Sequence, residues 1–417
     1  MAYMGATHTR ADLAAADVGD ALAGVRERFI LPEGVIYLDG NSLGALPRAT
    51  AARVQDLVVR QWGRDLIRSW NSHDWIGAPA RIGGKIAPLI GAGADEVIVA
   101  DSTSVNLFKL VTGALSLRPG RRVILTEPGN FPTDLYILQG VSDLLGERVE
   151  LRVRSREALP DAIDDDTAAV VLTHVHYKTA ERWPMAAITA RAHAHGALAV
   201  WDLSHSAGAL ALDLNRDGAD IALGCGYKYL NGGPGAPSFV FVARRWQDRM
   251  APPLSGWMGH ADPFGFGDDY RPASGIRRQL CGTPAMLGLA ALEAGVDEFG
   301  GLDMAQVEAK GLALGDAFIA LVEARCADAG WQLASPRASA ARGSHVSFRH
   351  PDGYPIMQAL IARGVIGDFR APDILRFGFT PLYLRFVDIW DAVETLRAVI
   401  DTGEYRDPRF SARATVT

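Results

Sequence analysis

Residues 196–235 read GALAVWDLSHSAGALALDLNRDGADIALGCGYKYLNGGPG, and this stretch decides the fold. An apolar run at 197–201 ends on Asp202, and a second run at 220–223 leads to Lys228. Short apolar runs bounded by turn residues are typical of strands that are buried on both faces of a sheet. We therefore expect a carboxylate and a lysine to lie at the same edge of one sheet.

Two interpretations fit this pair of charges. Pyridoxal phosphate catalysis needs a lysine that forms a Schiff base and a carboxylate that keeps the pyridine nitrogen protonated. An ordinary ion pair in an α/β protein uses the same residues, because ionisable pairs need not be functional. The spacing alone does not separate the two interpretations, so the rest of the chain has to decide.

The segments before this stretch alternate between strands and helices. The expected strands lie at 96–100, 121–126 and 167–173, and the expected helices at 105–115, directly after a turn at 129–134, and at 186–195. Such alternation predicts βαβ units and a mainly parallel sheet, which is an α/β fold. Nearer the N-terminus we expect helices at 11–29 and 49–62, and a surface loop at 63–80.

The pattern changes after about residue 295. Asp303 and Gln306 open an amphipathic helix that extends to about residue 327, and shorter strands and helices follow it. We expect a large domain at 46–295 and a smaller α+β domain at 296–417, which the N-terminal segment 1–45 joins.

The composition is that of a globular protein, with 48% hydrophobic residues and a formal net charge of −6 over 417 residues. No block of Lys or Arg indicates a nucleic acid or an anionic membrane. Cys225, Cys281 and Cys326 lack metal-site spacing and fit a reducing compartment. The N-terminus lacks the apolar core of a signal peptide, and no run approaches the ~20 apolar residues of a membrane span. We expect a cytoplasmic protein without bound metal, nucleic acid or membrane.

One motif points to a different class of enzyme. Residues 40–44, GNSLG, match the GxSxG nucleophile elbow and follow an expected strand. The elbow serine normally sits on a sheet that is already several strands deep, whereas only one strand precedes Ser42. A glycine-rich turn between a strand and a helix is the favoured explanation of the motif, and a serine hydrolase using Ser42 stays open as an alternative.

Two hydroxyl-rich turns precede helices, at Thr103-Ser104 and at 129–134. The first turn of a helix binds phosphate well, although Ser and Thr also occur there simply as caps. In open α/β sheets, ligands bind outside the carboxyl ends of the strands. Both turns are therefore expected beside Asp202 and Lys228.

Taken in order, these segments resemble the kynureninase family of pyridoxal phosphate hydrolases, which have the aspartate aminotransferase fold (fold type I, class V aminotransferase-like). The resemblance is carried by IYLDGNSLG at 36–44, FPTD at 131–134, WDLSH at 201–205, YKYLN at 227–231, GWMGH at 256–260 and RFGFTPLY at 376–383. It implies a seven-stranded sheet, a homodimer with shared active sites, and hydrolysis of L-kynurenine to anthranilate and L-alanine by Cβ–Cγ cleavage. It also implies a place in tryptophan catabolism, on the kynurenine pathway towards NAD biosynthesis.

The resemblance implies roles for individual residues. Lys228 would bind the cofactor and move the α-proton, and Asp202 would pair with the pyridine nitrogen. Phe131 would stack on the ring, Tyr227 would donate a proton, and Arg376 would bind the substrate carboxylate. The other implied cofactor contacts are Thr103, Ser104, Asp134, Thr173, His205, Tyr227, Trp257 and Thr283, of which Trp257 and Thr283 come from the partner chain. Trp70 and Ser42 are implied substrate contacts, and the group that activates water is not identified.

Alternatives remain for several of these residues. Phe131 and Trp257 are also suited to a core, and Arg376 to a structural ion pair. A cysteine desulfurase of the same fold would need a nucleophile, for which Cys281 is the candidate. A non-catalytic binding protein on this fold would not need Lys228, Asp202 and Arg376.

One variation within the family bears on the substrate. The positions that match Trp70 and Thr283 tend to be His and Asn in relatives that prefer 3-hydroxykynurenine. A pocket that offers no partner for the ring hydroxyl favours unsubstituted L-kynurenine.

Overall fold

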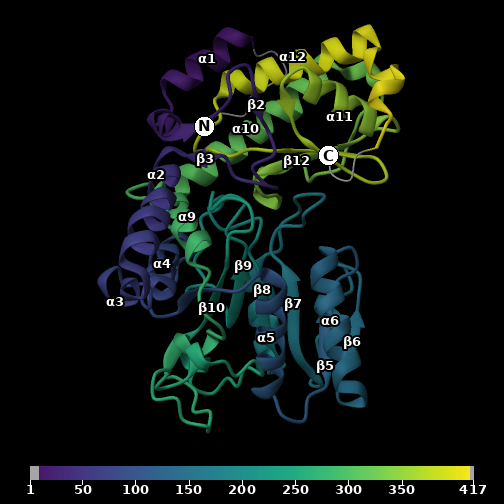
Figure 1. The fold of residues 1–417 in the computed structure, drawn as a ribbon. Helices are drawn as coiled ribbons and strands as arrows, with labels where there is room; N and C mark the ends of the chain where they lie inside the picture. Colours follow the sequence, from purple (N-terminus) through teal and green to yellow (C-terminus); the bar gives the residue numbers. More distant parts are fainter. Residues whose placement is uncertain (1–8, 414–417) are drawn as a thin grey trace.

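A seven-stranded sheet forms the centre of the computed structural model, which describes residues 9–413 (Figure 1). The strand order is β4-β10-β9-β8-β7-β5-β6, and β5 to β9 run parallel to one another. Only β10 is antiparallel to its neighbours β4 and β9. The strands are β4 (Val97–Ala100), β5 (Val123–Thr126), β6 (Glu150–Val153), β7 (Thr167–Thr173), β8 (Leu198–Asp202), β9 (Ile221–Gly224) and β10 (Ser238–Val242). The predicted α/β fold with a mainly parallel seven-stranded sheet is confirmed.

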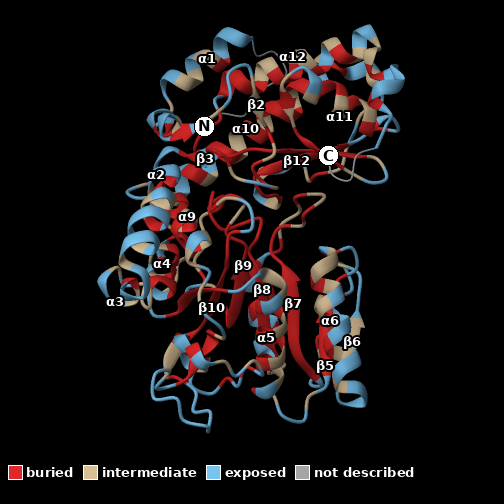
Figure 2. Cartoon of the chain, viewed as in Figure 1, coloured by how far each residue is buried: buried red, intermediate tan, exposed pale blue. Residues whose placement is uncertain are grey.

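Helices cover both faces of this sheet, and the central strands are buried throughout (Figure 2). On β7, Val171 belongs to the core under α5 (Thr103–Ser116) and α6 (Pro132–Leu145), whereas its neighbour Leu172 belongs to the core under α7 (Met185–Ala194). Alternate side chains point to opposite faces of a strand, so an unbroken apolar run is what a two-sided sheet requires.

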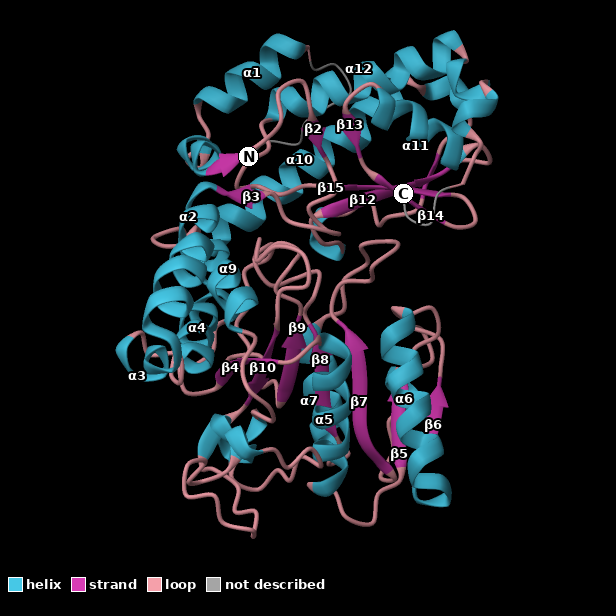
Figure 3. Ribbon diagram, in the orientation of Figure 1, coloured by secondary structure: helices cyan, strands magenta, loops and turns pink. Residues whose placement is uncertain are grey.

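A second, antiparallel sheet follows in the C-terminal part, with the order β11-β12-β15-β14. Its strands are β11 (Gln332–Leu333), β12 (His345–Arg349), β14 (Asp368–Arg370) and β15 (Ile374–Gly378), and its helices are α10 (Met304–Arg325), α11 (Gly353–Ala362) and α12 (Phe386–Thr402) (Figure 3). The N-terminal segment lies against this part: β2 (Ile36–Tyr37) pairs with β13 (Val365–Ile366), and α1 (Arg10–Val18) contacts α12. The expected boundary at 295/296 falls inside α9 (Met286–Asp297), and the domain limits stay a prediction.

Two expectations about the N-terminal third are wrong. The predicted helix at 11–29 ends at Val18, because Gly19 caps it, and a separate 3₁₀ turn follows at Ala23–Arg28. The predicted loop at 63–80 is mostly helical: α2 (Arg48–Asp56) continues into a π-helical segment, Leu57–Asp65, and α3 (Ser69–Ser72) and α4 (Ala78–Ile86) follow. Polar residues are frequent in this stretch because most of residues 63–72 are exposed or only partly buried.

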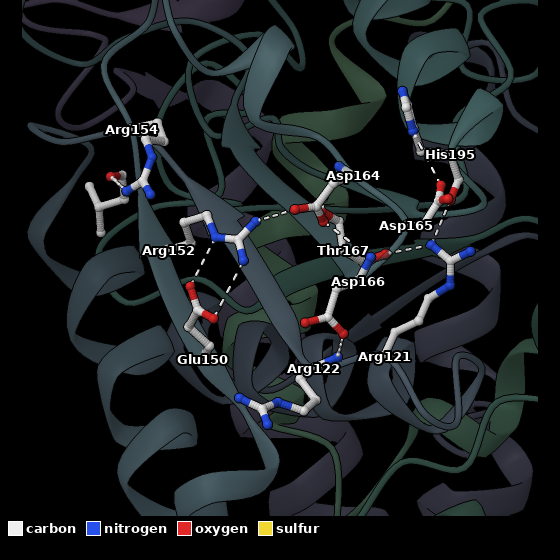
Figure 4. A network of polar contacts seen from close by, with 11 residues as sticks. Arg121, Arg122, Glu150, Arg152, Arg154, Asp164, Asp165, Asp166, Thr167 and His195 are labelled. Atoms are coloured by element: carbon white, nitrogen blue, oxygen red, sulfur yellow. Dashed lines mark hydrogen bonds and ion pairs between the residues drawn. The ribbon is translucent and has the colours of Figure 1, made fainter.

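The amino ends of β5, β6 and β7 are joined by a polar network (Figure 4). Arg152 contacts Glu150 at 2.9 Å and Asp164 at 2.6 Å, and Arg121 donates to the carbonyl oxygen of Thr167 at 3.0 Å. This network ties the strand ends together on the side of the sheet opposite to the carboxyl ends of these strands. None of the helices within residues 9–413 combines the length with the apolar character that crossing a bilayer requires.

Candidate active site

A cavity opens at the carboxyl ends of the central strands. Eight of the predicted cofactor contacts line it together: Thr103, Ser104, Phe131, Thr173, Asp202, His205, Tyr227 and Lys228. They come from the ends of β7 and β8, the loop after β9 and the first turns of α5 and α6. This is the edge at which open α/β sheets bind ligands, so the topology explains why residues far apart in the chain meet there.

Lys228 is the amine of this cavity and is only 9% exposed. Its Nζ lies 3.0 Å from His205 Nε2 and 5.6 Å from the centre of the Phe131 ring. Burial, reinforced by the charge of Lys228, lowers the pKa of His205 well below its usual range, so this ring is neutral. Nδ1 of His205 is buried without a hydrogen-bond partner among the described residues.

Asp202 ends β8, and its Oδ1 accepts a hydrogen bond from the Ser204 amide at 2.7 Å. Behind it lies Asp134, in the first turn of α6, which accepts a hydrogen bond from the Thr173 hydroxyl at 3.0 Å. Burial, followed by the nearby Asp202 charge, raises the pKa of Asp134 well above its usual value. Asp134 therefore keeps a proton that an exposed aspartate would lose.

The first turn of α5 offers hydroxyls and amides to the cavity. Ser102 caps this helix by accepting from the Val105 amide at 3.4 Å, as its position before the helix predicts, and Thr103 and Ser104 follow it. Ser102, Thr133 and Ser204 also line the cavity, although they are absent from the predicted site. Each carries a hydroxyl group and lies next to a predicted cofactor contact in the sequence, and this proximity could have identified it.

The glycine-rich turn at 40–44 packs on the lysine loop. Gly44 N donates to the carbonyl oxygen of Tyr227 at 2.8 Å, and a Cβ at Gly44 would lie 2.4 Å from the carbonyl oxygen of Lys228. The second glycine of the motif thus permits a close backbone approach. Burial raises the pKa of Tyr227 above its usual value, so its phenol is a proton donor at neutral pH.

Arg376 lies on β15 and is 2% exposed. Its guanidinium contacts Asp368 through two nitrogens, Ser42 Oγ at 2.7 Å and the carbonyl oxygen of Tyr177 at 2.7 Å. The partners of Ser42 are therefore a guanidinium and, at 3.0 Å, the Asp368 carboxylate, rather than the imidazole that a serine nucleophile needs.

Six predicted contacts do not line the Lys228 cavity: Asp134, Arg376 and Ser42, described above, and Trp70, Trp257 and Thr283. Trp70, on α3, meets Trp75 edge to face at 5.8 Å. Trp257 is 39% exposed, and Thr283 lines a neighbouring cavity that also includes Cys281. Within one chain, the structure does not bring these residues to the cavity that Lys228 lines.

The residues of the Lys228 cavity fit pyridoxal phosphate. They supply an amine for its aldehyde, an aromatic face for its ring, a carboxylate for its nitrogen and a helix N-terminus for its phosphate. The unpartnered Nδ1 of His205 is a further polar atom available to a ligand. Within the residues that the structure describes, no group of three or more His, Cys, Asp or Glu side chains is placed to hold a metal ion.

Comparison with known proteins covers almost the whole chain. The chain is 54% identical to the kynureninases of Burkholderia mallei (strain SAVP1) and Pseudomonas fluorescens, over 98% of its own length and 100% of theirs. Residues 307–396 match the family model of the kynureninase C-terminal domain. Among solved structures, the cysteine desulfurase of Thermococcus onnurineus NA1 superposes with a TM-score of 0.76 at 18% identity, covering 91% of this chain and 98% of that one. A mutant of the cystine C–S lyase C-DES, with glycine covalently linked to its PLP cofactor, gives 0.75 at 17% identity over 89% of this chain and 98% of that one. The solved structures support the fold alone.

Proposed function

The chain belongs to the kynureninase family, a family of pyridoxal phosphate-dependent hydrolases, and from this premise we propose that it cleaves the Cβ–Cγ bond of L-kynurenine to give anthranilate and L-alanine. The observation that carries the proposal is the cavity in which Lys228, Asp202 and Phe131 meet at the N-terminal turn of α5. This arrangement supplies every group that the cofactor needs from one chain, apart from the contacts that the resemblance assigns to a partner.

Each wall of the cavity has a proposed task in holding the cofactor. Thr103, Ser104 and the helix amides beside them bind the phosphate, and Phe131 stacks on the ring. Asp202 pairs with the ring nitrogen, while Asp134 behind it keeps its proton and adds no second charge. When bound, the cofactor withdraws electrons from the substrate carbons that react.

Lys228 is the proposed base that removes and returns the α-proton. Its neighbour His205 is neutral and lies within hydrogen-bond distance of Nζ, so His205 Nε2 can accept a hydrogen bond from the lysine and orient it. Tyr227 keeps its phenolic proton at neutral pH and is the proposed donor during carbon–carbon cleavage. Mutation of Tyr227 to Phe is therefore expected to lower kcat more than it raises KM.

Arg376 is the proposed partner of the substrate carboxylate, with Ser42 beside it. We also infer a preference for L-kynurenine over 3-hydroxykynurenine, because Trp70 and Thr283 leave the ring hydroxyl without a strong partner. A kcat/KM ratio of about tenfold or more in favour of L-kynurenine is expected. The reverse ratio would show that other residues set the preference.

A homodimer is part of the proposal. Trp257 and Thr283 lie outside the Lys228 cavity of their own chain, and Trp257 is 39% exposed together with Phe264 at 54% and Phe266 at 78%. Exposed aromatic clusters of this kind are typical of contact surfaces. A second copy would cover them and bring both residues to its neighbour's site.

The test uses wild-type protein and the K228A variant. Wild type loaded with pyridoxal phosphate is expected to release fluorescent anthranilate from L-kynurenine, and K228A is expected to lose this activity by several orders of magnitude. Mutation of Cys281 to Ser is the matched control, because only a desulfurase mechanism needs that thiol. If wild type desulfurates cysteine and ignores L-kynurenine, the proposed function is wrong, and loss of that desulfuration in C281S would identify Cys281 as its nucleophile.

A further inference from the structure

The guanidinium of Arg376 is almost fully occupied by the chain itself. Nε donates to Asp368 Oδ1 at 2.9 Å, and Nη2 donates both to Asp368 Oδ2 and to Ser42 Oγ. Nη1 donates one hydrogen to the carbonyl oxygen of Tyr177 at 2.7 Å. A guanidinium carries five N–H groups, so one hydrogen on Nη1 has no partner among the described residues.

Asp368 is the residue that occupies one whole edge of this guanidinium. It lies directly opposite Arg376 in the antiparallel pairing of β14 with β15 and is 2% exposed. Its oxygens also accept from Arg370 Nη2 at 2.7 Å and from Ser42 Oγ at 3.0 Å. Although burial opposes ionisation, the charges of Arg376 and Arg370 lower the pKa of Asp368 below its usual value, so it is a carboxylate.

Nη1 of Arg376 is connected to the cofactor cavity through Tyr177. Nη1 bonds to Tyr177, whose ring meets the Phe131 ring edge to face at 5.2 Å, and Phe131 lines the cavity. The edge held by Asp368 lies on the other side of the guanidinium, within the small sheet. The two edges of one arginine therefore have different surroundings.

We propose that Asp368 is a positioning residue that holds the Nε–Nη2 edge of Arg376, so that the substrate carboxylate is received on Nη1. The inference rests on the proposed function of Arg376. The substrate does not displace Asp368, because a displaced carboxylate would be left buried with the charge of Arg370 alone. Arg370 and Ser42 hold Asp368 in turn.

The central experiment compares D368N with D373N. Asp373 lies on the same hairpin but pairs with Arg349 at 3.0 Å near the surface, so D373N makes the same chemical change away from Arg376. D368N is expected to raise KM for L-kynurenine roughly 10- to 100-fold, the loss typical of a charged hydrogen-bond partner, with a smaller change in kcat. D373N is expected to match wild type.

A substrate analogue separates positioning from a structural role. The α-carboxamide of L-kynurenine lacks the negative charge, so D368N and wild type should process it with similar KM. In an R376Q background, D368N is expected to add little further loss, because both changes remove the same interaction. If D368N proves unstable, R370Q tests the same point and is expected to raise KM for the acid alone by a smaller factor.

Several results would overturn the inference. A lower KM for L-kynurenine in D368N would mean that Asp368 competes with the substrate. Equal losses on the acid and the carboxamide, or in D368N and D373N, would assign it a structural role only. Failure of the proposed function is distinguishable, because then wild type itself would release no anthranilate.

Discussion

The pKa of the Asp39 carboxyl group depends strongly on the residues around it. It precedes the glycine-rich turn, and its buried Oδ1 has no hydrogen-bond partner among the described residues. Burial, followed by the charge of Asp368, raises the pKa of Asp39 to about 7, although Arg376, Arg370 and Ser42 act in the opposite direction. Three tyrosines, Tyr37, Tyr229 and Tyr383, also lie within its electrostatic reach.

The pKa of Asp39 predicts a pH dependence of stability. The folded state holds the Asp39 proton more tightly than the unfolded chain does. The contribution of this proton to the free energy of unfolding is therefore full below about pH 4 and is lost as pH rises to about 7. The loss is on the order of 4 kcal/mol, since one pKa unit is about 1.4 kcal/mol. Mutation of Asp39 to Asn removes the ionisable group and with it this loss. The free energy of unfolding of D39N should therefore be higher than that of wild type, by a difference that grows from pH 5 to pH 8.

Urea unfolding at several pH values measures this difference. D373N is the control, and its difference from wild type should not follow the same pH course. A constant difference between D39N and wild type across pH 5 to 8 would show that Asp39 ionises normally.

The sequence predicts some residues of the site better than others. Lys228 and Asp202 follow apolar runs, and the strands indeed end beside them. The hydrogen-bond partners of Arg376 could not be predicted from sequence, because Ser42 lies 334 residues away in the chain and Tyr177 lies 199 residues away. Only the packing of the two sheets brings them together.

At the scale of elements, the sequence identified those with a clear period and missed those at the surface. The central strands of the large sheet are apolar runs, whereas the edge strand β6, with Glu150 and Arg152, is not and was not predicted. The helix α10 follows Asp303, which accepts from the Ala305 amide at 2.9 Å as a cap. The helical stretch at 63–72, beyond the predicted helix at 49–62, has no such signal, because it carries exposed Leu66 and Ile67 beside charged residues.

The packing of the turn at 40–44 on the lysine loop gives a prediction for that element. In Gly44→Ala the new methyl group would meet the backbone of Lys228, which has to shift. Overpacking of this kind costs about 1–3 kcal/mol of unfolding free energy. Gly24→Ala is the matched control, because a Cβ at Gly24 meets nothing within 4 Å.

Urea unfolding and the visible absorbance of bound cofactor measure both effects. G44A is expected to be less stable and to bind pyridoxal phosphate more weakly, while G24A stays close to wild type. Equal behaviour of the two variants would mean that the turn adapts without disturbing the lysine.

At the scale of the whole molecule, the proposed site lies between the two sheets. The large sheet provides the cofactor cavity, and the small sheet provides Arg376 and Asp368. The βαβ alternation was enough to predict the first part. The second part depends on how β12, β14 and β15 assemble against the large sheet, and short strands with irregular connections do not specify that from sequence alone.

The proposed dimer predicts complementation between two inactive variants. K228A lacks the amine, and W257A lacks a contact that a partner chain would supply. If the two are mixed, unfolded and refolded together, about half of the dimers are hybrids and each hybrid has one intact site, which gives about a quarter of wild-type activity. Light scattering on wild type should give the mass of two chains.

The outcome that contradicts the shared site is equally clear. A mixture no more active than its better component would place Trp257 outside the partner's site. A wild-type mass of one chain would exclude the dimer itself.

The position of the cofactor is the central claim, and borohydride reduction followed by peptide mass analysis tests it most directly. Wild type loaded with pyridoxal phosphate should carry the reduced, covalently attached cofactor on the peptide that contains Lys228, and K228A should carry none. Label on Lys109, which is buried against Asp101 at 2.6 Å, or on Lys178 would contradict the assignment, as would protein that binds no cofactor at all.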